Sequence, residues 1–200
     1  MFDTRLRRFI DAPLNAGARG LARAGISANA LTIAGAVIGI IAAVAISQQQ
    51  YWAALFLILA NRIMDGIDGA VARIDGATEY GGYLDLLADF LFYVSVPLAF
   101  GLASKANMLP ALLLLASFTL NAASFLGFAA IAARNGNDDG EHGAKAFIYS
   151  AGLMEGGETI AFFILFCLFP NEFPILAFVF AALCIVTVAQ RMALAARRLR

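Results

Sequence analysis

One stretch indicates the fold and chemistry of this chain: Asp65-Gly-Ile-Asp-Gly-Ala-Val-Ala-Arg-Ile-Asp-Gly-Ala-Thr-Glu-Tyr-Gly-Gly-Tyr-Leu-Asp-Leu-Leu-Ala-Asp89. It places four aspartates, Asp65, Asp68, Asp85 and Asp89, within 25 residues of a 200-residue chain that is 62% hydrophobic. Carboxylates beside membrane-length apolar runs are costly and are therefore functional candidates. Four of them at this spacing predict a metal site with oxygen ligands rather than isolated surface charges.

Long apolar runs surround this stretch and indicate an all-α, polytopic membrane protein. The mean hydropathy is +0.80 and 14% of the residues are charged, whereas a spanning helix needs about 20 mostly apolar residues. Six runs meet this requirement and use most of the chain: 30–47, 52–73, 82–104, 108–133, 146–169 and 173–195. We therefore expect a single domain over 1–200, with an interfacial helix at 1–26 and a six-helix bundle at 27–200. The length and uniformity of the runs argue against a soluble helical bundle.

The basic residues are unevenly distributed and predict an orientation in the membrane. With six spans, the arginines near both termini fall on one side, together with Arg73, Arg134 and Lys145, and only Lys105 lies in a loop on the other side. The positive-inside rule then predicts an inner-membrane protein with both termini and the acidic stretch in the cytoplasm. Topology and affinity for anionic lipid explain this basic charge better than nucleic-acid binding does.

Residues 1–26 have no apolar segment and cleavage site of the kind found in a signal peptide. Their apolar residues recur at roughly helical spacing among arginines, which predicts an amphipathic interfacial helix. A disordered basic tail is the alternative.

The spacing of the aspartates predicts how they meet. The first two are three residues apart and the last two are four apart, so each pair shares one face of a helix. A break containing Asp75-Gly76 and Gly81-Gly82 lies between the pairs and predicts an antiparallel helical hairpin that brings the pairs together. One or two divalent cations would resolve the resulting repulsion. Magnesium, manganese and calcium prefer carboxylate oxygens, and the absence of His and Cys argues against zinc.

Small residues follow the first aspartate and leave one helix face nearly bare: Gly66, Gly69, Ala70 and Ala72. Such a face allows a substrate to approach the backbone, although small residues also serve packing between membrane helices. Arg73 follows directly and is suited either to bidentate pairing with a phosphate or to anchoring at the membrane surface. Together these features suggest a metal-bound diphosphate at the membrane surface.

This pattern resembles the signature of the CDP-alcohol phosphatidyltransferases, Asp-Gly-x2-Ala-Arg-x7-Gly-x3-Asp-x3-Asp. Every fixed position is present, and the matching residues are Asp68-Gly69, Ala72-Arg73, Gly81, Asp85 and Asp89. Asp65 matches the extra leading aspartate of the longer form. A second match is Asn29-Ala-Leu-Thr32, where the family often has Pro-Asn-x-x-Thr and this chain has Ala28 before the asparagine.

The resemblance implies a metal centre and a general base. Asp65, Asp68 and Asp85 would ligate a pair of divalent cations, Mg²⁺ or Mn²⁺, and Asp89 would share in the second site. Asp89 would also take the proton of an acceptor hydroxyl, which then attacks the lipid-side phosphorus and releases CMP. The product would be a phospholipid, and family members are commonly homodimers.

The resemblance also implies where the nucleotide part of the donor lies. A CDP-alcohol, typically CDP-diacylglycerol, would rest against Gly69 and Ala72, with Arg73 assisting at the diphosphate. The second match adds Asn29 and Thr32 to this nucleotide and diphosphate site. A CDP-choline or CDP-ethanolamine donor with diacylglycerol as acceptor remains an alternative.

The acceptor site is less clearly marked in the sequence. Arg134 and Lys145 suit a phosphorylated polyol, although topology explains them equally well. Glu155 and Glu158 fall well inside the fifth apolar run, where they indicate either an acceptor pocket or an internal polar contact. The partners considered for that contact are Asn121, Ser124 and Arg62, and the other polar candidates on this side are His142, Tyr149 and Arg191.

Asn61 and Arg62 lie one turn before Asp65 and are candidate supports for the metal ligands.

The main rival function is a cation transporter or channel, because intramembrane carboxylates also line ion paths. Such a path needs polar residues through the whole membrane, whereas the acids here cluster toward one face.

Overall fold

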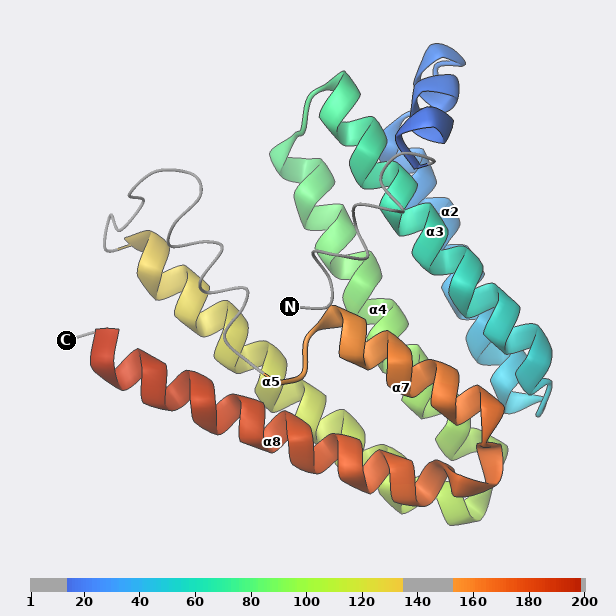
Figure 1. Ribbon diagram of the computed structural model, residues 1–200, viewed down its shortest axis with the longest axis vertical. Coiled ribbons are helices and arrows are strands. Elements are labelled where there is room, and N and C mark those ends of the chain that lie inside the picture. The colour runs from blue at the N-terminus through green and yellow to red at the C-terminus, as the bar shows by residue number, and fades with distance from the viewer. Residues whose placement is uncertain (1–13, 135–152, 199–200) are drawn as a thin grey trace. The chain divides into compact units, whose positions relative to one another are not determined.

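The computed structural model describes residues 14–134 and 153–198, and every regular element in these two ranges is helical (Figure 1). This confirms the all-α class. The chain divides into two compact units, Met1–Ala103 and Ser104–Arg200. The expectation of one domain over 1–200 stays a prediction.

The first unit is built on three long helices: α2 (Ala28–Ser47), α3 (Tyr51–Asp75) and α4 (Glu79–Ala103). Helix α2 packs against both α3 and α4, which run in opposite directions as the two arms of a hairpin (Figure 1). The sequence prediction of this hairpin is confirmed.

The connection between the two arms is short and is set by local chemistry. Helix α3 ends at Gly76, whose φ of +98° is a backbone conformation that favours glycine. Helix α4 begins directly afterwards, where the Gly81 N–H donates to Thr78 Oγ1 at 3.0 Å. The predicted break at 75–76 is therefore confirmed. The break does not extend to 81–82 as predicted, because both glycines lie in the first turn of α4 and the Thr78 side chain caps that turn.

Glycines on α2 allow its two neighbours to approach closely. Asn61 Nδ2 of α3 donates to the carbonyl oxygen of Gly35 at 2.8 Å. A Cβ atom at Gly39 would lie 3.1 Å from the Phe92 ring of α4 and 3.3 Å from Asn61 Nδ2. Small residues at such contacts are typical of packing between membrane helices.

The described part of the N-terminal segment is helical over 14–23. Ala18 is fully buried in a cluster with Leu31 of α2 and with Ala70 and Val71 of α3. Leu14 packs over Gly66, where a Cβ atom would lie 2.9 Å from Leu14 Cδ1. The helical interpretation of this segment is therefore confirmed for 14–23, while 1–13 lie outside the described residues.

The described residues of the second unit form three α-helices: α5 (Met108–Arg134), α7 (Gly156–Leu168) and α8 (Phe173–Arg198). Helix α5 packs along α8, and phenylalanine rings fill the contacts with α7. Phe180 stacks on Phe162 at 4.4 Å between ring centroids and meets Phe118 edge-on at 5.1 Å. Cys167 and Cys184 are free and buried, as expected for cysteines that serve packing.

Four stretches within the described residues are long and apolar enough to cross a membrane: Ala28–Ser47, Glu79–Ala103, Lys105–Ile131 and Pro170–Ala196. Helix α3 has 25 residues but carries the acidic stretch. Helix α7 has 13 residues, fewer than the roughly 20 that a span requires. The predicted fifth span begins at 146, outside the described residues, so the count of six stays a prediction.

The contact at Gly39 provides a test of the packing. We expect Gly39→Leu to lower the midpoint of thermal unfolding in detergent, because overpacking a filled contact costs about 1–3 kcal/mol. Gly127→Leu is the matched control, since a Cβ atom at Gly127 meets nothing within 4 Å. Equal midpoints for the two variants would contradict the close approach of α2 to Phe92 and Asn61.

Candidate metal and substrate site

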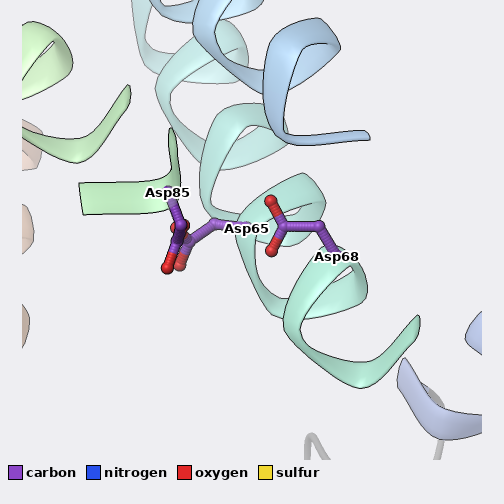
Figure 2. Close-up of side chains that lie close together, drawn as sticks. All are labelled: Asp65, Asp68 and Asp85. Carbon is purple, nitrogen blue, oxygen red and sulfur yellow. The ribbon is translucent and has the colours of Figure 1, made fainter. Parts of the chain in front are cut away.

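Three carboxylates from the two arms of the hairpin lie close together. Asp65 and Asp68 come from the C-terminal half of α3 and Asp85 from the start of α4. Each offers one oxygen, and the three oxygens lie within 4.8 Å of one another. Figure 2 shows the Asp65 and Asp85 carboxylates side by side, with that of Asp68 directed toward them. This all-oxygen donor set fits a hard divalent cation such as Mg²⁺ or Mn²⁺.

Asp68 is held by a hydroxyl group from α2. Thr32 Oγ1 donates to Asp68 Oδ2 at 2.7 Å, and both side chains are buried. The same hydroxyl lies 3.1 Å from the Ala28 carbonyl oxygen, but an ionised carboxylate is the stronger acceptor. Thr32, which the resemblance assigned to the nucleotide and diphosphate site, therefore contacts a candidate metal ligand directly.

Asp89, the fourth predicted metal ligand, is not part of the three-oxygen group. Its Oδ1 accepts a hydrogen bond from Arg62 Nη1 at 3.0 Å. The same nitrogen lies 3.8 Å from Asp65 Oδ2. Arg62 thus bridges Asp89, the predicted base on α4, and Asp65, a candidate metal ligand on α3.

Arg62 is itself fixed by its neighbours. Its Nε and Nη2 donate to Asn61 Oδ1 at 2.9 and 2.7 Å, and its guanidinium carbon lies 4.5 Å from the centre of the Phe92 ring. Of the two residues predicted as supports, Arg62 contacts the carboxylates and Asn61 contacts Arg62. What the sequence did not indicate is that Arg62 reaches Asp89 across the hairpin.

The residues predicted for the diphosphate lie together on the surface of α3. Gly69 and Ala72 are half-buried and Arg73 is exposed. A Cβ atom at Gly69 would lie 3.5 Å from Arg73 Nη1, so the guanidinium group lies close to the bare glycine. Asn29 lies in the first turn of α2, and its Oδ1 is 3.0 Å from a Cβ atom built at Gly81 of α4.

Glu155 and Glu158 lie at the start of a helix, and their depth in the membrane stays a prediction. Helix α7 begins at Gly156, and the two glutamates form a capping box at its first turn. The Glu155 N–H donates to the Glu158 carboxylate at 3.3 Å. Carboxylates at a helix N-terminus satisfy backbone N–H groups that have no partner within the helix, which explains their presence inside an apolar run.

The remaining acceptor candidates are only partly described. Arg134 is the last residue of α5, whereas Lys145, His142 and Tyr149 lie outside the described residues. Arg191 Nη1 donates to Asn121 Oδ1 at 2.8 Å. It also lies 3.4 Å from Ser124 Oγ.

The family is established by comparison with known proteins. Residues 26–189 match the model of the CDP-alcohol phosphatidyltransferase family. The chain is 43% identical to the inner membrane protein YnjF of Escherichia coli (strain K12) over 193 residues, which covers 96% of this chain and 94% of that protein. The chain therefore belongs to the CDP-alcohol phosphatidyltransferases, a family of transferases. The family match and the apolar helices make it an integral membrane protein.

More distant relatives carry enzyme names. Archaetidylinositol phosphate synthase of Pyrococcus horikoshii is 33% identical over 101 residues, half of this chain and 53% of that protein. Phosphatidylcholine synthase of Legionella bozemanae is 36% identical over 80 residues, 38% of this chain and 36% of that protein. Membership in a transferase family favours the enzyme interpretation over the cation transporter or channel.

The fold is shared with a phosphatidylinositol phosphate synthase of Mycobacterium tuberculosis. Its crystal structure in complex with manganese and citrate has a TM-score of 0.69 and 20% identity, covering 90% of this chain and 87% of that one. Its structure with CDP-DAG bound has a TM-score of 0.68 and 19% identity, covering 90% and 92%.

The contact between Thr32 and Asp68 predicts an effect on metal binding. We expect Thr32→Val, which keeps the shape but removes the donor, to weaken Mn²⁺ binding about 10-fold, as loss of a hydrogen bond behind a metal ligand commonly does. Calorimetric titration of the purified protein with Mn²⁺ measures this. Thr119→Val is the control, because that hydroxyl is exposed on α5 and bonds only its own helix. Equal affinities in both variants would contradict the support that we assign to Thr32.

Proposed function

We propose that this protein transfers a phosphatidyl group from CDP-diacylglycerol to the hydroxyl of a small polar alcohol and releases CMP, in phospholipid biosynthesis. The observation that carries the proposal is the convergence of three signature carboxylates within 4.8 Å at the α3–α4 hairpin. The enzyme names of the distant relatives and the CDP-DAG-bound structural neighbour support the choice of reaction and donor. The basic residues near both termini favour a site on the cytoplasmic side of the inner membrane.

In this proposal Asp65, Asp68 and Asp85 hold two divalent cations, Mg²⁺ or Mn²⁺, and Asp89 completes the second site. Bound there, the cations would neutralise the donor diphosphate and stabilise the leaving CMP. Thr32 keeps the Asp68 carboxylate turned toward the other two. The donor set supports this assignment, because carboxylate oxygens are the ligands that both metals prefer.

The donor rests on the bare face of α3. Gly69 and Ala72 allow the nucleotide to approach the helix backbone, and the exposed Arg73 guanidinium beside Gly69 pairs with a diphosphate oxygen. Asn29 and Thr32 belong to the same site on the α2 side. Exposed apolar side chains on the neighbouring helices suit the acyl chains of a lipid donor, since CDP-diacylglycerol is itself a membrane component.

Asp89 acts as the general base. Its carboxylate takes the proton of the acceptor hydroxyl, and the acceptor oxygen forms a bond to the lipid-side phosphorus. The bond from that phosphorus to the bridging oxygen breaks, and CMP leaves with the electron pair. A carboxylate within hydrogen-bond reach of the attacking hydroxyl is the usual requirement for this role.

The acceptor side of the proposal rests on the second unit. Arg134 and Lys145 are the residues that we assign to a phosphorylated acceptor, because basic side chains pair with phosphate. Glu155 and Glu158 are assigned to a hydroxyl-rich or cationic acceptor, since their carboxylates gather at the exposed start of α7. We also expect a homodimer, as is common in this family.

Release of CMP by the purified protein in detergent tests the reaction. The assay contains CDP-diacylglycerol, Mn²⁺ or Mg²⁺, and one acceptor from a panel of glycerol phosphate, inositol phosphate, inositol, serine and choline. We expect release with one acceptor and its loss when a chelator is added. Absence of release with every acceptor, together with absence of CDP-diacylglycerol binding, would contradict the proposed function.

Asp89→Asn tests the base separately. Because an amide cannot take the proton, we expect turnover to be abolished while binding of CDP-diacylglycerol remains measurable. Asp75→Asn is the matched control, since Asp75 is an exposed aspartate at the end of α3, the other arm of the hairpin, and lies outside the three-oxygen group. A near-normal rate in Asp89→Asn would remove Asp89 as the base.

A further inference from the structure

Arg62 has no part in the reaction described above, yet several defined contacts hold it in the described part of the first unit. Its side chain is 18% exposed, and its Nη1 lies 3.0 Å from Asp89 Oδ1 and 3.8 Å from Asp65 Oδ2. It contacts Asp89 through Nη1 and Asn61 through Nε and Nη2. A half-buried arginine with this many defined partners has a single preferred orientation, because the planar guanidinium group fixes its donors relative to one another.

The contacts that fix Arg62 come directly from α3 and α4, and from α2 through Asn61. Asn61, its neighbour on α3, is anchored to the Gly35 carbonyl of α2 at 2.8 Å. Phe92 on α4 presents its ring face to the guanidinium group at 4.5 Å, a favourable arrangement for a cation and an aromatic ring. The direction of Nη1 toward Asp89 therefore follows from the packing of the whole unit.

Arg62 acts mainly on Asp89. The 3.0 Å contact with Asp89 Oδ1 is a hydrogen bond, whereas Asp65 Oδ2 lies 3.8 Å away, beyond hydrogen-bond distance. The oxygen that accepts from Arg62 is Oδ1, and the Asp89 side chain is 30% exposed. One oxygen of this carboxylate is therefore fixed, and the other is available to a ligand or substrate.

We propose that Arg62 is a positioning residue for the transfer reaction: it holds Asp89 through Oδ1, so that Oδ2 receives the proton of the acceptor hydroxyl. This inference rests on the proposed function, in which Asp89 is the base. The hydrogen bond from Arg62 also accounts for the position of Asp89 outside the three-oxygen group, because it holds the Asp89 carboxylate beside the guanidinium group.

A role as a plain counter-charge makes a different prediction. Lysine retains the positive charge, but its single ammonium group cannot reproduce the contacts of Nε and Nη2 with Asn61 and of Nη1 with Asp89 at different edges of the guanidinium plane. Arg62→Lys therefore separates charge from geometry. Arg62→Gln removes both.

The test measures CMP release, CDP-diacylglycerol binding and Mn²⁺ binding for wild type, Arg62→Lys and Arg62→Gln. We expect kcat to fall about 10- to 100-fold in both variants, because small misplacements of a reacting group cost on this order. The KM for the donor and the affinity for Mn²⁺ should stay unchanged. Arg73→Gln provides the contrast, with a raised donor KM, and Arg23→Gln, an exposed arginine of helix 14–23, provides the control with normal kinetics.

Three results would overturn the inference: a normal kcat in Arg62→Gln, full restoration of kcat by lysine, or a fall in kcat that accompanies loss of donor binding and of thermal stability. The last result would mean that Arg62 serves folding alone.

A double-mutant cycle tests the contact without any substrate. The loss in thermal midpoint for Arg62→Gln combined with Asp89→Asn should be smaller than the sum of the two single losses, because the two residues share one interaction. Additive losses would overturn the Arg62–Asp89 link. Absence of CMP release by wild type would instead count against the proposed function, so the two failures are distinguishable.

Discussion

Repulsion among the Asp65, Asp68 and Asp85 carboxylates is the constraint that the first unit has to satisfy. Their oxygens lie within 4.8 Å of one another, next to helices long enough to cross a membrane. At this separation like charges repel, and the burial of Asp68 strengthens the repulsion. The protein opposes this repulsion from two sides, with the Thr32 hydroxyl on Asp68 and the Arg62 guanidinium between Asp65 and Asp89. The remaining negative charge is what makes the site suited to divalent cations.

The small residues of α2 make this arrangement possible. Because Gly35 and Gly39 have no side chains, Asn61 can reach a backbone carbonyl and Phe92 can lie directly against the helix. These two residues then hold Arg62 from opposite arms of the hairpin. Buried polar groups are stabilising only when their hydrogen bonds are satisfied. The close packing and the polar site therefore depend on each other, and a larger residue on α2 would disturb both.

The sequence predicted the features of the site that depend on local spacing, and it missed those that depend on distant contacts. Asp65 and Asp68 share a helix face because they are three residues apart. Helix α3 ends before Gly76 because a glycine there permits a positive φ. The bond from Thr32 to Asp68 spans 36 positions and that from Arg62 to Asp89 spans 27. Neither follows from periodicity, since both depend on the register in which α2, α3 and α4 pack.

In the second unit the sequence prediction missed a local feature, the start of helix α7, because that start lies within a long apolar run. Residues 146–169 are apolar enough to suggest one continuous span, yet helix α7 begins only at Gly156. The signal was present as Glu155-Gly-Gly-Glu158, because a glutamate three residues after a capping residue closes a capping box. The residues that we propose for the acceptor lie in this unit, where contacts join groups far apart in the chain, as the 70-residue separation of Arg191 and Asn121 illustrates. The family signature, in contrast, is contained in the 25-residue stretch from Asp65 to Asp89. This is why the sequence identifies the family more readily than the acceptor.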